Sequence, residues 1–213
     1  MMDDDSKGNL ADRTGFRGGL DSLMLAAGTA AGPRPVESWT PPYCGDIGLA
    51  IDAGGAWSYQ GSPIGRPAMV KLFASILRKD ADGKTYLVTP AEKVDVRVAD
   101  APFLAVEMAV TGEGHGQSLT FRTNVDDVVM VDAAHPLRFA EQHPTGGLKP
   151  YILVRGRLEA LVTRAVYADL VVLAVPGGDA GQTADATNLG IWSGGVWWEL
   201  AAQPRMAPFA AGN

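Results

Sequence analysis

Cysteine, histidine and net positive charge are all scarce in this chain of 213 residues. The single cysteine, Cys44, excludes an intrachain disulfide and favours a reducing compartment. The three histidines, His115, His135 and His143, have no partner at a spacing typical of metal ligands, so we expect neither a metal nor another cofactor. The net charge of −6 argues against nucleic acid as a partner.

Long apolar runs are missing as well. LMLAAGTAA, near the N-terminus, is too short to span a bilayer. The first residues, MMDDDSKG, are acidic and lack the charged and apolar regions of a signal peptide. A hydrophobic content of 46% with 20% charged residues is ordinary for a globular protein. We therefore expect a cytoplasmic protein without membrane contacts.

Proline and glycine divide the chain into four parts. A tail with a short helix over 20–31 is expected for residues 1–35, and an α+β domain for 36–102. A second α+β domain is expected for 103–205, followed by a tail at 206–213. The break near Pro102, where the pattern of strands starts again, separates the two domains.

Short apolar runs joined by turns indicate antiparallel strand pairs. One hairpin turns at Asp52-Ala53-Gly54-Gly55, and KVDVRV alternates as a half-buried strand should. Helical spacing predicts one helix from Pro67 to about Lys79 and a second, largely buried, over 158–174. Hairpins with only two main helices favour the antiparallel α+β class.

The two halves show a similar order of features. Residues 59–77 and 151–170 each run from an aromatic strand end through a glycine and an arginine into an expected helix, and a strand pair follows. This pattern fits either a duplicated strand–helix–hairpin unit or a coincidence among ordinary α+β segments.

Many uncommon short sequence motifs resemble those of one bacterial family. In the first half they are CGDIGLAIDAGGAWSYQGSPIGRP, VKLFASIL, LVTPAEKV and DAPFLAVEM; in the second they are LTFRTN, HPLRF, KPYILVRGRLEALVTRAVYADL and IWSGGVWWEL. They resemble domain of unknown function 1285 over about residues 36–200, with Gly48 departing from an expected aspartate. The resemblance implies two related small domains, the second pleckstrin-homology-like. It also implies a small-molecule site between the domains, for a nucleotide-type signalling ligand.

Three candidate functional motifs each lack a residue that their chemistry requires. Gly83-Lys84-Thr85 lacks the upstream glycine of a phosphate-binding loop and precedes a strand instead of a helix. Asp80-Ala81-Asp82-Gly83 has no downstream acid to complete a calcium loop. Ser193 lacks the preceding glycine of a nucleophile elbow. We therefore predict no catalytic residue.

Arg66 is in an unusual place for an arginine. It directly precedes Pro67, so it occupies the N-cap position of the first predicted helix. Arginine cannot accept a hydrogen bond there, and its charge lies at the positive end of the helix dipole. An anion between the guanidinium and the helix would relieve this conflict.

The remaining candidate residues follow from Arg66. Arg155 lies at the matching junction of the second half, and Asp169 projects onto the apolar stripe of the second helix, where a charge must be paired. Either Asp169 pairs with a nearby arginine and locks the halves together, or an arginine holds an anion. Ser62 and Gly65 would add donors. The expected ligand-binding residues are Trp57, Tyr59, Ser62, Gly65, Arg66, Thr123, Asn124, Arg138, Arg155, Arg164 and Asp169.

The leading hypothesis is a regulatory protein, not an enzyme, that binds a small anionic ligand such as a nucleotide between its two domains. One alternative is a protein-interaction adaptor, in which the pleckstrin-like half binds a protein partner, the cleft is only packed structure, and an exposed Trp198 or the glycine-rich turns would matter. Another is a hydrolase of a phosphorylated metabolite, with a general base among His135, Glu92 and Asp169.

Overall fold

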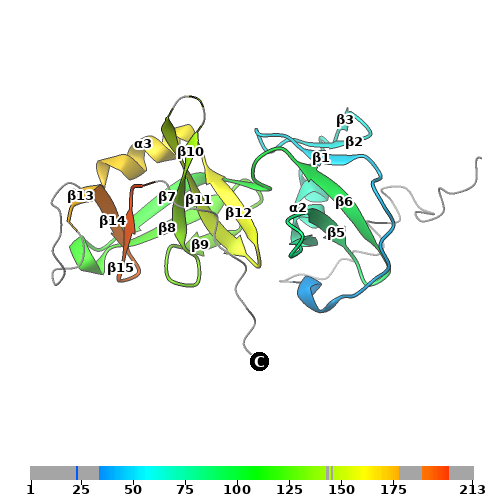
Figure 1. Cartoon of the computed structure of the whole chain (residues 1–213), viewed down its shortest axis with the longest axis horizontal. Helices are drawn as coiled ribbons and strands as arrows, with labels where there is room; N and C mark the ends of the chain where they lie inside the picture. The colour runs from blue at the N-terminus through cyan, green and yellow to red at the C-terminus, as the bar shows by residue number, and fades with distance from the viewer. Residues whose placement is uncertain (1–22, 24–33, 143, 145, 178–188, 202–213) are drawn as a thin grey trace, which may run out of the picture.

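Short strands separated by glycine- and proline-containing turns build two six-stranded sheets, which lie side by side along the long axis of the molecule (Figure 1). The computed structural model describes residue 23 and residues 34–142, 144, 146–177 and 189–201. The helix expected over 20–31 lies outside the described residues except for the buried Leu23, and so does most of the loop at 176–188.

The first sheet belongs to the N-terminal half. Its elements are η1 (Val36–Ser38), β1 (Leu49–Ile51), β2 (Trp57–Tyr59), β3 (Ser62–Pro63), α2 (Pro67–Ser75), β4 (Leu77–Lys79), β5 (Thr85–Val88) and β6 (Lys93–Val98). The strand order is β3-β2-β1-β6-β5-β4, and only the β1–β6 pair is parallel.

The second half repeats this arrangement and extends it. Its elements are β7 (Phe103–Thr111), η2 (Gly114–Gly116), β8 (Ser118–Thr123), β9 (Val128–Met130), β10 (Leu137–Gln142), β11 (Gly147–Arg155), β12 (Leu158–Val162), α3 (Arg164–Val172), β13 (Val175–Pro176), β14 (Leu189–Ser193) and β15 (Val196–Glu199). The large sheet has the order β10-β11-β12-β7-β8-β9, and β13, β14 and β15 form a small antiparallel sheet.

The two large sheets have the same topology. Each consists of two three-stranded antiparallel meanders, joined by a parallel pair between the first strand of the first meander and the last strand of the second. The related domains expected from the sequence are therefore present. The predicted repeat unit is wrong in one respect, because α2 lies between the third and fourth strands whereas α3 follows the sixth.

Tertiary pairing corrects both predicted helices. The helix predicted to reach Lys79 ends at Ser75, because Leu77–Lys79 forms β4 and pairs with β5. The segment Leu158–Val162, predicted as helix, is strand β12 with alternating burial between β11 and β7. Apolar spacing over so few residues fits either periodicity, and the available strand partners decide.

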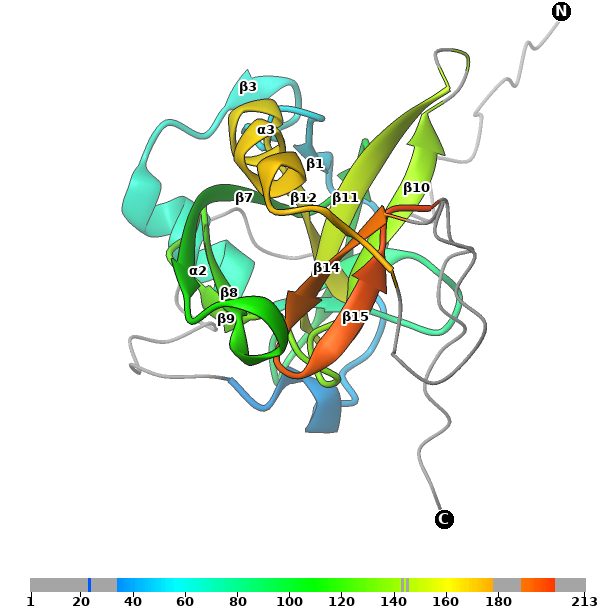
Figure 2. The ribbon, with the colours of Figure 1, turned by 90° about the vertical axis from the view of Figure 1, so that its left-hand side faces the viewer.

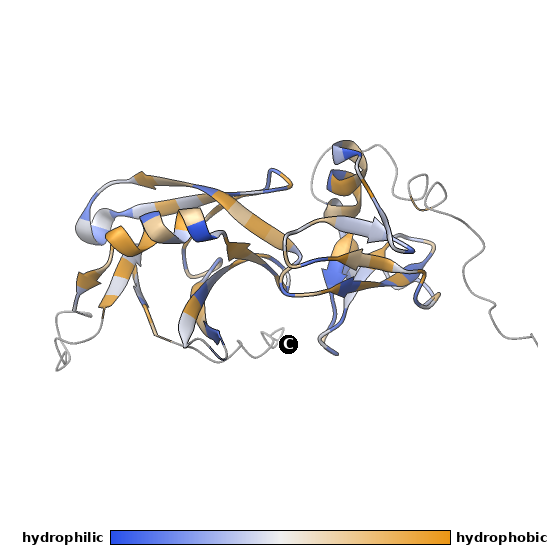
Figure 3. Ribbon diagram, turned by 90° about the horizontal axis from the view of Figure 1, so that it is seen from above, coloured by the Kyte–Doolittle hydropathy of each residue, from blue (hydrophilic) through white to orange (hydrophobic). Residues whose placement is uncertain are grey.

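The predicted hairpins are confirmed. The turn at Asp52–Gly55 joins β1 to β2, and Gly55 has a positive φ of 78° that glycine adopts without strain. Hairpins also join β5 to β6, β7 to β8 and β14 to β15. Figure 3 shows apolar residues along the strands and on both helices, while several connecting turns are hydrophilic.

The small sheet packs against one end of the second large sheet (Figure 2). Ser193 fastens it there, because its fully buried hydroxyl donates to the Val131 carbonyl at 2.7 Å and accepts from the Leu119 N–H at 2.9 Å. Within the described residues no helix is long and apolar enough to cross a membrane.

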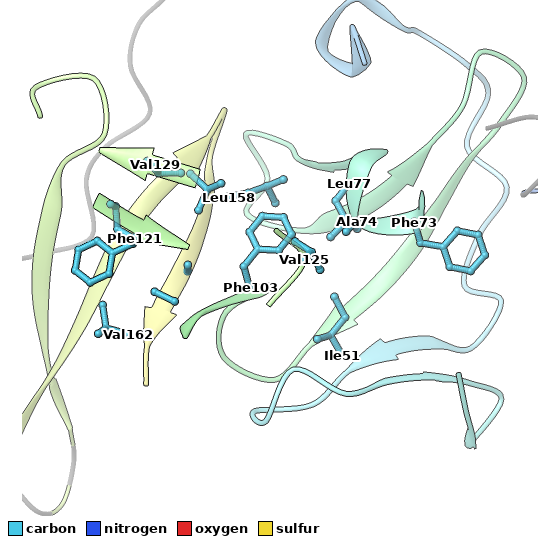
Figure 4. Close-up of a cluster of buried hydrophobic side chains, with 14 of the residues drawn as sticks. Ile51, Phe73, Ala74, Leu77, Phe103, Phe121, Val125, Val129, Leu158 and Val162 are labelled. Carbon is cyan, nitrogen blue, oxygen red and sulfur yellow. The ribbon is translucent and has the colours of Figure 1, made fainter. Parts of the chain in front are cut away.

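The hydrophobic core is continuous between the domains (Figure 4). Phe103, at the start of β7, is fully buried between the N-terminal residues Ile51 and Ala74 and the C-terminal sheet. Arg155 closes over this contact: its guanidinium lies 4.9 Å from the Phe103 ring centroid. The two halves therefore share one core.

Candidate functional site

Arg66 occupies the N-cap of α2 with Pro67 next to it, as predicted. Its side chain makes no capping hydrogen bond and is exposed, and it forms no ion pair with any described residue. Ser62 and Gly65 are exposed as well. Solvent therefore explains how an arginine is tolerated at this N-cap. The exposed guanidinium is hydrated, and the helix dipole repels it only weakly.

Arg155 joins the two domains directly. Its Nη1 donates to Asp127 Oδ2 at 2.5 Å, and its Nη2 donates to the Ala74 carbonyl of α2 at 2.6 Å. The side chains of Arg155 and Asp127 are 31% and 35% exposed. Both ends of this guanidinium are thus occupied by protein, which makes Arg155 a structural residue rather than a ligand-binding one.

The predicted lock through Asp169 is wrong. Arg164 and Asp169 are both exposed on α3, and Asp169 forms no ion pair with any described residue. The buried positions of the helix are Val166 and Leu170. The prediction assumed a helix that began at residue 158, and the actual start at Arg164 leaves Asp169 on the solvent side.

Arg138 is a buried structural cation. It is 6% exposed and donates to both oxygens of Glu159, at 2.5 and 2.7 Å, while its guanidinium lies 4.4 Å from the Tyr151 ring centroid. Burial works to lower the pKa of Arg138, but the hydrogen bonds and charge of Glu159 outweigh it and raise that pKa. The pair is neutralised within the protein.

The other predicted residues fill the core or fix turns. Trp57 is 3% exposed and packs against Phe73, and its Nε1 has no partner among the described residues. Tyr59 is partly buried against the same core. The buried Thr123 hydroxyl accepts from the Asp127 N–H at 3.0 Å, and Asn124 Oδ1 accepts from the Leu104 N–H at 3.0 Å. The structure does not gather the predicted set into one site.

A groove of about 560 Å³ lies elsewhere, where β5 begins and β6 runs into the linker between the domains. None of the predicted ligand-binding residues lines it. Its lining residues are Asp46, Lys79, Gly83, Lys84, Thr85, Asp95, Val96, Arg97, Val98, Ala99, Asp100 and Pro102. In Figure 1 this region is the end of β6 from which the chain crosses to β7.

Two cations of the groove lie just past the end of the β5–β6 ladder. The last pair at this end is Thr85 with Val96, and Lys84 and Arg97 are the next residues on the two chains. Like charges opposite each other on neighbouring strands are destabilising. Lys84 is exposed and forms no ion pair with a described residue, and Arg97 reaches only Asp46, at 3.6 Å.

The carboxylates of the groove are largely occupied. Asp100 accepts from Lys149 and from the Tyr151 hydroxyl, each at 2.7 Å, and so ties the linker to β11. Burial and the bond to Asp100 raise the pKa of Tyr151. Asp95 Oδ2 accepts from Tyr43 at 2.6 Å, which raises the pKa of Tyr43, and Asp95 Oδ1 is buried without a partner among the described residues.

The sequence offered only part of this site. The alternation in KVDVRV already places Asp95 and Arg97 on one face of a strand. Lys84 belongs to the Gly83-Lys84-Thr85 sequence that fails as a phosphate-binding loop. The pairing of β5 with β6, which places Lys84 near Arg97, is a matter of register that local patterns leave open.

Among the described residues, no group of three or more histidine, cysteine and acidic side chains could hold a metal ion. His135 Nδ1 lies 3.2 Å from Asp132 Oδ1. The hydroxyl of the nearby Ser193 is fully buried and already hydrogen-bonded to the Val131 carbonyl and the Leu119 N–H. Burial raises the pKa of Glu92, and its backbone N–H donates to the Thr89 hydroxyl at 3.1 Å. Trp198 is partly buried and donates to the Ser193 carbonyl at 3.2 Å.

Two sheets of the same topology, one shared core and a charged groove beside the linker define a duplicated two-domain α+β protein. Residues 34–101 match the family model described as "Domain of unknown function (DUF1285), N-terminal domain". Residues 102–200 match the model described as "Protein of unknown function (DUF1285), C-terminal domain". The chain therefore belongs to the DUF1285 family, as the resemblance of its sequence indicated.

Two solved structures of DUF1285 family proteins are similar to this chain. The one from Silicibacter pomeroyi DSS-3 is 43% identical, with a TM-score of 0.77 over 86% of this chain and 95% of that chain. The one from Shewanella baltica OS155 is 29% identical, with a TM-score of 0.47 over 59% of this chain and 91% of that chain. No curated protein matches the sequence. The pleckstrin likeness of the second domain stays a prediction.

Proposed function

We propose that this protein binds a small anionic ligand in a regulatory role, in the groove beside the inter-domain linker. The observation that carries the proposal is that Lys84 and Arg97 both line the groove at the end of the β5–β6 ladder, where Arg97 has only a 3.6 Å contact with Asp46 among the described residues. An anion between them would convert a repulsion into two charge-assisted hydrogen bonds. The groove volume, about 560 Å³, suits a small molecule.

The position of the groove suits a regulatory role. Asp100 and Pro102 line it, and Asp100 also binds Lys149 and Tyr151 of the second domain. A ligand that contacts the linker could therefore alter how the two domains are held together. A nucleotide remains within the proposed ligand class, and the cytoplasm remains the proposed location, which the single cysteine favours.

Thermal unfolding with a panel of ligands tests the proposal. The panel contains inorganic phosphate, small carboxylates, mononucleotides and cyclic dinucleotides. A ligand at about 100 times its Kd stabilises the folded state by about 2.7 kcal/mol, which corresponds to a rise in Tm of roughly 5–10 °C. Calorimetry then gives the affinity.

Matched variants of single cations show whether the ligand binds in the groove or at the start of α2. Lys84→Ala and Arg97→Ala should abolish the rise in Tm, whereas Arg66→Ala and Arg164→Ala, which remove exposed cations elsewhere, should leave it unchanged. Loss of binding in Arg66→Ala alone would move the site to the first turn of α2. A panel without any binding would end the proposal.

A protein-interaction adaptor is the second candidate, and edge strand β9 favours it. Val128 and Met130 on this strand are 67% and 44% exposed, at the unpaired edge of the second large sheet. Exposed apolar edges are sites of strand addition. Capture of a partner protein that is lost in Val128→Lys and kept in Lys84→Ala would favour this function over ligand binding.

A further inference from the structure

We infer that the ligand of the groove is peptide-like: a short extended chain with a terminal carboxylate, which adds as a strand beside the end of β6. The inference rests on the proposed function and narrows its ligand class. Three properties of the groove carry it: a bare strand edge, the absence of aromatic rings from its described lining, and a nearly balanced charge.

The strand edge is provided by Val98. Along β6 the backbone groups of alternate residues point to opposite neighbours: the N–H groups of Asp95 and Ala99 donate toward β1, to Gly45 and Ile51. The groups of Val96 therefore face β5, where Val96 pairs with Thr85, the first residue of that strand. By the same alternation, the next groups on that side are the N–H and C=O of Val98, which lines the groove and makes no backbone hydrogen bond to a described turn or loop residue. A peptide backbone offers the complementary acceptor and donor.

The described lining contains no aromatic ring. Recognition of a nucleobase commonly relies on stacking against an aromatic side chain. The apolar lining here consists of Val96, Val98, Ala99 and the buried Pro102, which suit small aliphatic side chains. The aromatic pair nearest to the groove, Tyr43 and Tyr86, is held by Asp95 and Asp82 and does not line it.

The charge of the groove selects a single carboxylate over a polyanion. Three cations line it (Lys79, Lys84 and Arg97), and three carboxylates (Asp46, Asp95 and Asp100) balance them. A di- or triphosphate would bring negative charge close to these acids, which is unfavourable. One carboxylate between Lys84 and Arg97 leaves the total near neutral, and the planar guanidinium of Arg97 can bind it through two parallel hydrogen bonds.

The geometry thus assigns a place to each part of the ligand. The terminal carboxylate lies between Lys84 and Arg97. The N–H and C=O of the penultimate residue pair with the C=O and N–H of Val98, in line with β5. The aliphatic side chains contact Val98 and Pro102 near the linker.

An NMR titration of the full-length ¹⁵N-labelled chain tests the inference. Four probes are compared: N-acetyl-trialanine with a free carboxylate, the same peptide as its C-terminal amide, the free acid with its central peptide nitrogen methylated, and AMP. The free acid should shift the amide signals of Lys84, Arg97 and Val98. The amide and the methylated peptide should each bind about tenfold more weakly, since each loses one strong hydrogen-bonding group.

Variants place the carboxylate and show that the fold is intact. Lys84→Ala and Arg97→Ala should each weaken binding of the free acid by about tenfold or more, and Arg164→Ala should leave it unchanged. The spectrum of each unliganded variant shows whether it is folded. If Arg97→Ala does not fold, Arg97→Lys keeps the charge and removes the planar pair of donors.

The other outcomes overturn the inference in different ways. Equal affinity for the free acid and the amide would show that the carboxylate does not contribute to binding. Equal affinity for the free acid and the methylated peptide would show that the ligand does not pair with the strand. AMP binding more tightly than the free acid at the same amides would refute a peptide-like ligand but leave the proposed function standing. No shift in the groove with any of the four probes, nor with inorganic phosphate, would overturn both.

Discussion

Replacement of Arg155 by alanine is expected to lower the free energy of unfolding by about 2–3 kcal/mol. This side chain connects the domains directly, because it binds Asp127 on one side and the Ala74 carbonyl on the other. Its guanidinium also covers the ring of Phe103, which is fully buried. The substitution removes all three contacts at once.

The magnitude follows from the exposure of each contact. A hydrogen bond to a charged group contributes about 1.5–3 kcal/mol when shielded, but Arg155 and Asp127 are each about one third exposed, so we assign about 1 kcal/mol to their pair. The bond to Ala74 adds about 1 kcal/mol, since the carbonyl keeps a second donor, the Ile76 N–H. The contact with Phe103 adds about 0.5–1 kcal/mol.

Urea unfolding measures this loss. Tryptophan fluorescence reports on Trp39 and Trp57 in the first domain and on Trp192, Trp197 and Trp198 in the second, and far-UV circular dichroism reports on the whole chain. Arg164→Ala, which removes an exposed arginine from α3, should change the free energy of unfolding by less than about 0.5 kcal/mol. A double-mutant cycle with Asp127→Ala should give a coupling energy of about 0.5–1.5 kcal/mol.

The reasoning fails if Arg155→Ala is as stable as the wild type, or if the coupling energy with Asp127 is zero. Because the core is continuous between the domains, the two optical probes should also give coincident transitions in the wild type. Two separate transitions would show that the domains unfold independently and that Arg155 does not join them.

Two further predictions concern the buried network behind the linker. Glu159→Ala removes the carboxylate that binds the buried Arg138 guanidinium, so the free energy of unfolding should fall by about 3–5 kcal/mol. Glu159→Gln should lose less, and equal losses in urea unfolding would contradict the charge argument. The folded protein raises the pKa of Tyr151, so the stability linked to its protonated hydroxyl is full below about pH 10, the unfolded pKa, and declines as the pH rises above it. Tyr151→Phe should flatten the stability profile between about pH 9 and 11 relative to the wild type, and a profile with the same slope would show that another group causes the decline.

Local sequence patterns predicted the parts of the fold that depend on neighbouring residues. The alternation in residues 93–98, the glycine turn at Asp52–Gly55 and the start of α2 at Pro67 are set by side-chain size, backbone freedom and the missing N–H of proline. The segments at 76–79 and 158–162 could not be predicted in this way, because their apolar residues fit a helix as well as a strand. Pairing with β5 and with β7 decided both.

The candidate site depended still more on long-range contacts. The sequence drew attention to arginines, yet Arg138 and Arg155 are neutralised by Glu159 and Asp127, which lie 21 and 28 residues away. Lys84 and Arg97 were not among the predicted site residues, since only the β5–β6 register brings them together at the end of this strand pair. Charge pairing of this kind is a property of the folded chain and not of any local motif.

The sequence by itself determined the α+β class and most of the strands, because periodicity, turns and helix starts act over a few residues. Only the tertiary structure decided where two predicted helices end or become strands, which charges neutralise one another, and which strand edge stays open. Those choices depend on strand register and on the packing of residues far apart in the chain, and a one-residue shift in register would separate the two cations of the groove.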